Sequence, residues 1–283
     1  MHIEGRPAMK LFHYTDVSAV KSILENEKLW LTDVRFLNDS EEMHDGISSL
    51  VGYINNQLAN SPNRHEFFRD AAEYIERGLV GKTGYGIDSR PVFICSFSRA
   101  GDLLSQWRAY GSYAIEFVGE AISHEVFECV YDDDEKLSRA SSAALVSLDT
   151  ISNDMATNDG FLDRDGYEAF SDLVGLAATF KHDSFSEEQE VRIIVGHDID
   201  PEIDDGLEIK FRTRGNLLIP FVEAGISFES IRAIHIGPMR DQELAYISMK
   251  AFVEKVHLAR EVTVHNFEHK VEVIKSSIPY RAP

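Results

Sequence analysis

Leu11-Phe12-His13-Tyr14-Thr15-Asp16 joins a strand-like apolar run to the start of an amphipathic helix. Thr15 or Asp16 suits the N-cap of that helix, whose apolar residues recur at helical spacing. His13 and Tyr14 therefore lie at a strand-to-helix corner, where helix N–H groups favour anions and an aromatic ring can stack on a base. The alternative is that His13 packs or caps locally and Tyr14 is a core residue. Strand alternation favours a core position for Tyr14, because it turns this ring away from the face of His13.

The composition predicts one globular domain. The chain has 283 residues, and 43% of them are apolar, which is enough for a substantial core. Residues 1–8 contain Ile-Glu-Gly-Arg, a protease-recognition sequence used in expression vectors, so we interpret them as a tag remnant. We expect residues 9–283 to form a single domain with a helical insertion at about 132–178, where strand-forming residues are few.

Charge and hydropathy restrict the partners. No apolar run reaches the roughly 18 to 20 residues of a membrane span, so we expect a soluble, cytoplasmic protein without a membrane partner. The net charge of −20 opposes sequence-independent binding to nucleic acid. One stretch is basic despite the acidic composition: Lys210, Arg212 and Arg214 share a face if they form a strand. That face is either a local anion-binding patch or an ordinary solvated strand face.

The two cysteines indicate neither a disulfide framework nor a zinc site. Cys95 lies in an apolar strand pattern and Cys129 in Phe-Glu-Cys-Val-Tyr. We expect both to be buried small hydrophobes, and we expect no metal. The familiar glycine-rich nucleotide loops, the zinc-protease motif and the hydrolase serine motif are also missing from the sequence.

Apolar periodicity predicts the remaining elements. Strands are expected at 28–32, 91–97, 112–118, 185–195, 207–213, 231–236 and 261–267. Helices are expected in two segments between 40 and 77, at 101–111, within 132–178 and at 241–257. Strands and helices interleave without a regular alternation, which favours an α+β fold with a mixed or largely antiparallel sheet and helical insertions.

Two residue clusters could bind or act on a ligand. In a strand, Glu190 and Arg192 share a face. The carboxylate can serve as a general base or stabilise developing positive charge, and the adjacent guanidinium can hold the carboxylate or bind a phosphate. Trp107, Arg108 and Tyr110 combine rings that can stack with a cation that can bind phosphate or carboxylate. The alternatives are a surface ion pair at the first cluster and a core anchor at Trp107.

The ordered motifs of the chain resemble the bacterial family catalogued as domain of unknown function 2971. The resemblance spans nearly all of residues 9–281. Its motifs are Phe12-His13-Tyr14-Thr15, Leu29-Trp30-Leu31, Leu37-Asn38-Asp39-Ser40-Glu41, Cys95-Ser96-Phe97-Ser98, Leu104-Ser105-Gln106-Trp107-Arg108-Ala109-Tyr110-Gly111, Glu188-Gln189-Glu190-Val191-Arg192, Ile236-Gly237-Pro238 and Ile278-Pro279-Tyr280-Arg281. The family name supplies no activity.

The chain has an early His-Tyr-Thr before a helix, a middle strand region with aromatic residues and a late Glu on a strand. In this order it more distantly resembles the ADP-ribosyltransferase fold, particularly its His-Tyr-Glu branch and the toxins that modify DNA bases. This resemblance implies that His13 contacts a ribose of NAD, that Tyr110 or Tyr113 stacks on nicotinamide, and that Glu190 orients the ribose and assists transfer. Cleavage of the nicotinamide–ribose bond develops oxocarbenium character that a carboxylate can stabilise. Arg108 or Arg192 is then expected to hold the pyrophosphate.

We therefore predict an NAD-consuming ADP-ribosyltransferase or NAD glycohydrolase that acts as a bacterial toxin or antiphage effector. Its catalytic residues would be His13 and Glu190. The residues expected to bind NAD are His13, Tyr14, Trp107, Arg108, Tyr110 and Arg192. The acceptor would be a protein, a nucleic acid or a small molecule.

Two alternatives remain open. One is a non-catalytic nucleotide-sensing or protein-interaction module that uses the same pocket. The other is a metal-dependent nuclease or phosphodiesterase that uses His13, Asp39 and Glu41.

Overall fold

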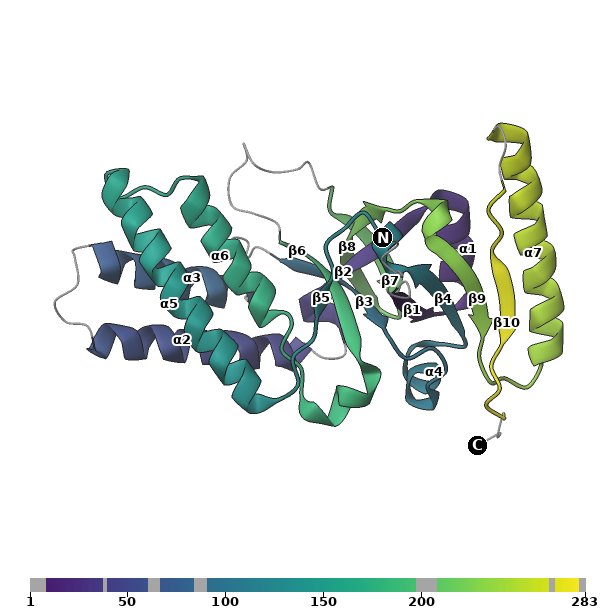
Figure 1. Ribbon diagram of the computed structural model, residues 1–283, viewed down its shortest axis with the longest axis horizontal. Coiled ribbons are helices and arrows are strands. Elements are labelled where there is room, and N and C mark those ends of the chain that lie inside the picture. The colour runs from purple at the N-terminus through teal and green to yellow at the C-terminus, as the bar shows by residue number, and fades with distance from the viewer. Residues whose placement is uncertain are drawn as a thin grey trace, which may run out of the picture.

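The computed structural model describes residues 9–37, 40–60, 67–83, 91–196, 208–264 and 268–279 (Figure 1). The strands are β1 (Lys10–Thr15), β2 (Lys28–Asp33), β3 (Val92–Ser98), β4 (Tyr113–Val118), β5 (Phe127–Glu128), β6 (Glu190–Gly196), β7 (Lys210–Arg214), β8 (Leu217–Gly225), β9 (Ile231–Ile236) and β10 (Glu272–Lys275). The α-helices are α1 (Val17–Asn26), α2 (Ser40–Asn60), α3 (Phe67–Thr83), α4 (Leu104–Tyr110), α5 (Asp133–Thr157), α6 (Arg164–Ala177) and α7 (Gln242–Thr263).

All ten strands belong to one sheet, which is antiparallel except where β10 runs parallel to β9. Its main path is β10-β9-β4-β1-β3-β2-β8-β7, and β6 joins β3 while β5 joins β6. The predicted α+β class with a largely antiparallel sheet is therefore confirmed.

Strand β3 shares one of its edges between two different strands. Thr32 and Asp33 of β2 pair with Ile94 and Phe93, at the beginning of β3. Phe12 of β1 pairs with Ser98, at its end. The sheet therefore opens between β1 and β2 along the middle of β3, while β6 pairs with β3 over its whole length.

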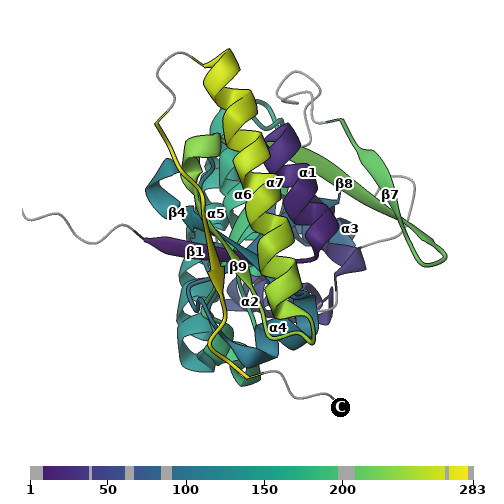
Figure 2. The ribbon, with the colours of Figure 1, turned by 90° about the vertical axis from the view of Figure 1, so that its right-hand side faces the viewer.

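Two hydrophobic cores lie on opposite faces of this sheet. The first core includes Val20 of α1, Val253 of α7 and inward-facing residues of the strands. The second core joins α2, α3, α5 and α6 to Val92 and Ile94 of β3. Figure 1 shows these four helices gathered at one end of the molecule, and Figure 2 shows α7 and α1 covering the other face of the sheet.

Most predicted elements are found near their expected positions, with three differences. Residues 183–188 form a short 3-10 helix, so the strand expected at 185–195 begins only at Glu190. Gln189 explains this break, because its φ of 45° is left-handed and interrupts an extended chain. The strand expected at 261–267 is wrong at its start, since α7 continues to Thr263 despite its β-branched end. Residues 265–267 of that prediction lie outside the described residues, and β10 begins at Glu272. Strands β5 and β8 were not predicted.

None of the helices in the described part of the chain is both long enough and apolar enough to cross a membrane.

Gly111 holds the end of α4 against the corner between β1 and α1. Its φ is 133°, a conformation that favours glycine. A Cβ atom at this position would lie 2.3 Å from the carbonyl oxygen of Thr15. The chain can therefore bring Tyr110 next to the corner only because residue 111 has no side chain.

We expect Gly111→Ala to lower the free energy of unfolding by about 1–3 kcal/mol, because it adds backbone strain and a clash with backbone. Gly52→Ala is the matched control: Gly52 lies within α2 with nothing near its Cβ direction, and alanine there should stabilise by about 0.5–1 kcal/mol. Urea unfolding followed by circular dichroism measures both changes. Equal stability of Gly111→Ala and the parent protein would contradict this account.

Candidate functional site

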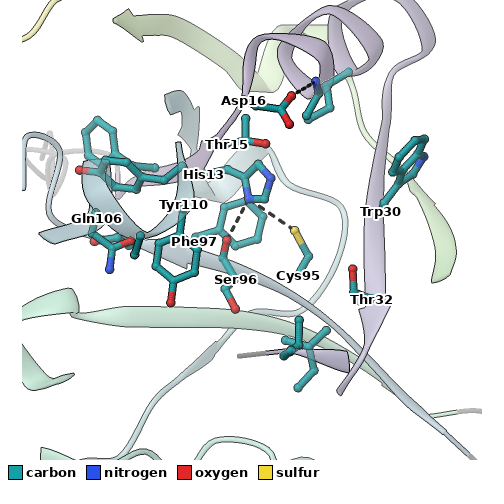
Figure 3. A pocket seen from close by; sticks show the side chains of 18 of the residues that line it. His13, Thr15, Asp16, Trp30, Thr32, Cys95, Ser96, Phe97, Gln106 and Tyr110 are labelled. Atoms are coloured by element: carbon teal, nitrogen blue, oxygen red, sulfur yellow. Dashed lines mark hydrogen bonds between the residues drawn. The ribbon is translucent and has the colours of Figure 1, made fainter. Parts of the chain in front are cut away.

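The opening between β1 and β2 leads into a pocket of about 560 Å³. Residues of β1, α1, β2, β3 and α4 line this pocket, together with side chains from β6 and β7. Figure 3 shows His13 at its centre, with Tyr110 and Gln106 on one side and Trp30 and Thr32 on the other. The volume lies within the range of about 300–1,000 Å³ that is typical of small-molecule sites.

His13 is held in one orientation by the unpaired middle of β3. Its Nδ1 lies 2.9 Å from the carbonyl oxygen of Ser96. A carbonyl only accepts hydrogen bonds, so Nδ1 carries the proton and Nε2 is the acceptor nitrogen of the neutral ring. Burial lowers the pKa of His13 below its usual value, and the positive charge of Arg212 lowers it further, against the raising effect of the Ser96 carbonyl. His13 is therefore neutral at pH 7 and offers an acceptor to a ligand hydroxyl.

The cysteine beside His13 is not a nucleophile. Cys95 Sγ lies 3.8 Å from His13 Nδ1, and the side chain is buried. Burial raises the pKa of this thiol to about 12, so it remains protonated at neutral pH. Cys129 is also buried, which confirms the prediction that both cysteines are buried small side chains.

Tyr14 and Trp107 pack against each other in a small third cluster. Their rings form an edge-to-face contact with centroids 4.6 Å apart. Tyr14 OH donates to the carbonyl oxygen of Ala100 at 2.6 Å, and Trp107 Nε1 donates to Asp102 Oδ1 at 2.8 Å. The polar tips of both rings thus have protein partners. Tyr14 reaches the pocket wall, whereas Trp107 does not line the pocket and rests on Gly237.

Tyr110 is the aromatic residue of α4 that faces the pocket. It lies in the last turn of the helix, lines the pocket and is 37% exposed. Gln106, one turn earlier, lines the same wall and is buried. Arg108 does not line the pocket. The helical spacing therefore brings Tyr110 and Gln106 to the pocket and turns Arg108 elsewhere.

Glu190 and Arg192 form the predicted pair, but within a buried ionic cluster. Arg192 Nε donates to Glu190 Oε1 at 2.6 Å, and Arg192 Nη2 reaches Glu190 Oε2 at 3.2 Å. Lys181 Nζ lies 2.6 Å from Glu190 Oε2 and 2.9 Å from Glu188 Oε2. Arg192 also donates to the carbonyl oxygen of Ala178 at 2.6 Å. The surface ion pair that the sequence left open is thus a buried cluster, and both carboxylates line the pocket.

The cluster keeps Glu190 ionised. Burial alone would raise the pKa of this carboxyl, but the charges and hydrogen bonds of Arg192 and Lys181 outweigh burial and lower the pKa to about 2. Burial opposes the charged form of Lys181 as well, and the carboxylates raise its pKa instead. Glu190 and Lys181 therefore remain charged together at neutral pH.

The basic strand also reaches the pocket. Arg212 and Arg214 of β7 line it, whereas Lys210 on the same face pairs with Glu223 at 2.9 Å. Strand pairing explains the reach: β7 lies beside β8, β8 lies beside β2, and Arg212 Nη2 donates to Thr32 Oγ1 of β2 at 2.9 Å.

Sequence reasoning assigned no role to two residues that line the pocket, Glu188 and Gln106, or to Lys181, which pairs with a pocket carboxylate. Glu188 could have been found from its spacing to Glu190, since both lie in one Glu-Gln-Glu motif. Gln106 could have been found from its helical spacing to Tyr110. The ion pair of Lys181 with Glu190 had no local signal, because it depends on how the segment before β6 folds back.

Of the three residues of the nuclease alternative, only His13 has its side chain among the described residues. Asp39 and the side chain of Glu41 lie outside the described residues. In the part of the chain that is described, no three His, Cys, Asp or Glu side chains are grouped as a metal site would require.

Comparison with known proteins finds a family match but no activity. Residues 106–193 match the family described as "Protein of unknown function (DUF2971)", which supports the family resemblance of the ordered motifs over this segment. The matched segment includes Tyr110, Lys181, Glu190 and Arg192. No curated protein and no solved structure matches the chain.

Glu190→Gln is expected to lower the free energy of unfolding at pH 7 by about 3–5 kcal/mol, because it removes the charge that balances two buried cations. The stability that the lowered pKa of Glu190 contributes is complete above the usual carboxyl pKa and is lost as pH falls from about 4.5 towards 2. Urea unfolding between pH 2 and 7 should therefore show a shallower acid decline in the variant than in the parent protein.

Glu135→Gln is the control, since Glu135 makes an exposed ion pair with Arg139 on α5. It should change the free energy of unfolding by less than about 1 kcal/mol. Similar losses in Glu190→Gln and Glu135→Gln would refute the buried cluster.

The two aromatic residues of α4 should respond differently to truncation. Trp107→Ala is expected to lower the free energy of unfolding by about 3–5 kcal/mol, because it leaves a cavity in the third cluster. Tyr110→Ala should cost less than about 1.5 kcal/mol, since its ring is partly exposed. Thermal and urea unfolding of both variants measure the difference, and the reverse order of stability would show that the two rings are misassigned.

Proposed function

We propose that the pocket binds NAD and that the protein is an ADP-ribosyltransferase or an NAD glycohydrolase with an ADP-ribosyltransferase-like core, acting in the cytoplasm. The observation that carries the proposal is that His13, Tyr110 and Glu190 line one pocket, although they come from β1, α4 and β6. The resemblance assigns ribose contact to His13 and ribose orientation to Glu190, and Tyr110 is one of the two tyrosines to which it assigns nicotinamide stacking.

The chemistry of each side chain suits its proposed role. Neutral His13 can accept a hydrogen bond from a ribose hydroxyl through Nε2. The partly exposed ring of Tyr110 can stack on the flat nicotinamide. Glu190 is ionised at neutral pH, so it can attract the positive charge that develops on the ribose.

The proposed reaction breaks the bond between ribose C1′ and the nicotinamide nitrogen. The bonding electron pair leaves with nicotinamide, which becomes neutral, and C1′ gains oxocarbenium character. An oxygen or nitrogen of the acceptor then bonds to C1′ and releases a proton. Water as the acceptor yields ADP-ribose, whereas a protein, nucleic acid or small molecule yields an ADP-ribosylated product.

One observation favours a second candidate, a non-catalytic nucleotide-sensing module. Both carboxylate oxygens of Glu190 are already engaged, Oε1 by Arg192 and Oε2 by Lys181. Such pairing offsets the negative charge that would stabilise the oxocarbenium ion. The pocket would then bind the nucleotide and signal its presence without cleaving it.

Incubation of the purified protein with NAD, with and without a bacterial lysate as a source of acceptors, should release nicotinamide that chromatography can quantify. Glu190→Gln should abolish release, and Tyr110→Ala should reduce it at least about tenfold, the loss expected when about 1.4 kcal/mol of binding is removed. Glu135→Gln, remote on α5, should keep the parent rate. Circular dichroism at the assay temperature ensures that each variant compared is folded.

The two candidate functions predict different outcomes of this assay. NAD binding by calorimetry without nicotinamide release under any condition would establish the sensing module and overturn the transferase. Neither binding nor release would exclude both. Release that persists in folded Glu190→Gln would show that the carboxylate is not the catalytic group.

A further inference from the structure

Two guanidinium groups stand at the β7 end of the pocket. Arg212 and Arg214 alternate along β7 and line the pocket, and the side chain of Arg214 donates through Nη2 to the carbonyl oxygen of Phe36 at 2.6 Å. This end of the pocket therefore carries positive charge, although the net charge of the chain is −20.

Arg212 is held in place but is only partly satisfied. Its guanidinium lies over the ring of Trp30, 5.4 Å from the centroid, and its one hydrogen bond to a described residue goes to the neutral hydroxyl of Thr32. Its Nε is buried and has no hydrogen-bond partner among the described residues. A guanidinium has five N–H donors, and a buried donor without an acceptor costs free energy.

The carboxylates of the pocket do not neutralise Arg212. Asp16 attracts it at a distance, but Asp16 Oδ1 caps α1 by accepting from the backbone N–H of Ala19 at 2.9 Å. Glu188 and Glu190 are bound to Lys181. No ion pair of Arg212 is present within the described part of the chain.

Arg214 carries the same charge as Arg212 and repels it. Burial lowers the pKa of Arg212, and repulsion by Arg214 lowers it further. An anion between the two groups would relieve that repulsion and supply acceptors to the free donors, which is the arrangement in which arginine binds phosphate oxygens.

We propose that Arg212 and Arg214 bind the diphosphate of a nucleoside diphosphate, so that the pocket selects ligands with two linked phosphates. This inference rests on the proposed function, because NAD contains such a diphosphate and would bind in the same pocket. The diphosphate would then lie beside β7. Of the two arginines that the sequence suggested for this role, Arg108 does not line the pocket. Arg192 lines it, but its guanidinium is bound to Glu190 and to the carbonyl oxygen of Ala178.

Isothermal titration with ADP, AMP and adenosine tests the subsite without any bond that the enzyme could cleave. We expect ADP to bind best and adenosine at least about tenfold more weakly, since adenosine lacks the charged acceptors. Arg212→Gln should weaken ADP binding about 10- to 100-fold and leave the already weak binding of adenosine unchanged. Arg212→Lys should recover only part of the loss, because an ammonium keeps the charge without the planar fork.

Lys210→Gln is the matched control, because it removes one positive charge from the same face of β7 outside the pocket. ADP affinity should change less than about twofold in this variant, since Lys210 pairs with Glu223 and contacts no pocket ligand. Arg214→Gln tests the second guanidinium of the subsite, and thermal melting verifies that each variant is folded.

The subsite and the reaction fail in different ways. Equal ADP affinity in Arg212→Gln and the parent protein, or equal losses in Arg212→Gln and Lys210→Gln, would overturn the diphosphate subsite. Adenosine binding as tight as ADP would also overturn it. ADP binding that depends on Arg212, in a protein that releases no nicotinamide from NAD, would uphold the subsite and reject only the proposed reaction.

Discussion

The pocket exists because β1 and β2 compete for the same edge of β3. Each of them pairs with a different end of that strand, so the backbone between the two ends must find other partners. The carbonyl of Ser96 finds one in the imidazole of His13, which orients the ring and fixes which nitrogen carries the proton. A complete ladder at this point would close the opening and remove the acceptor that His13 needs. The orientation of the His13 ring and the position of its proton are thus a consequence of incomplete sheet pairing.

The other edge of β3 is fully paired. It pairs with β6 without interruption, and this rigid ladder carries Glu190 and Arg192 at fixed positions. Lys181 completes an ionic cluster in which charges balance, so the carboxylate stays ionised although it is buried. The same balance limits how strongly Glu190 can act on a ligand. A ligand that draws one cation away would increase the effective charge of the carboxylate, which connects binding to the proposed chemistry.

Charge is distributed unevenly between the surface and the pocket. The chain carries 48 acidic and 28 basic residues, yet two arginines of β7 face the pocket, where Asp16, Glu188 and Glu190 already have partners. The acidic surface disfavours nucleic acid and other polyanions in general. A small anionic ligand that fits the pocket escapes most of that repulsion, because its contacts are short and partly desolvated. This charge distribution is compatible with the proposed nucleotide ligand and opposes binding of a nucleic-acid backbone.

Local patterns were enough to predict α1 with its cap at Thr15 or Asp16, the shared face of Glu190 and Arg192, and the opposite faces of His13 and Tyr14. Each of these depends on neighbours a few residues apart, where helical or strand periodicity decides the direction of a side chain. The tertiary structure alone decided that Tyr110 faces the pocket while Trp107 is buried, that Lys181 neutralises Glu190, and that Arg212 crosses β8 to reach Thr32. These contacts depend on which strands become neighbours and on where the sheet opens. Pairings between distant segments determine both, and no local pattern encodes them.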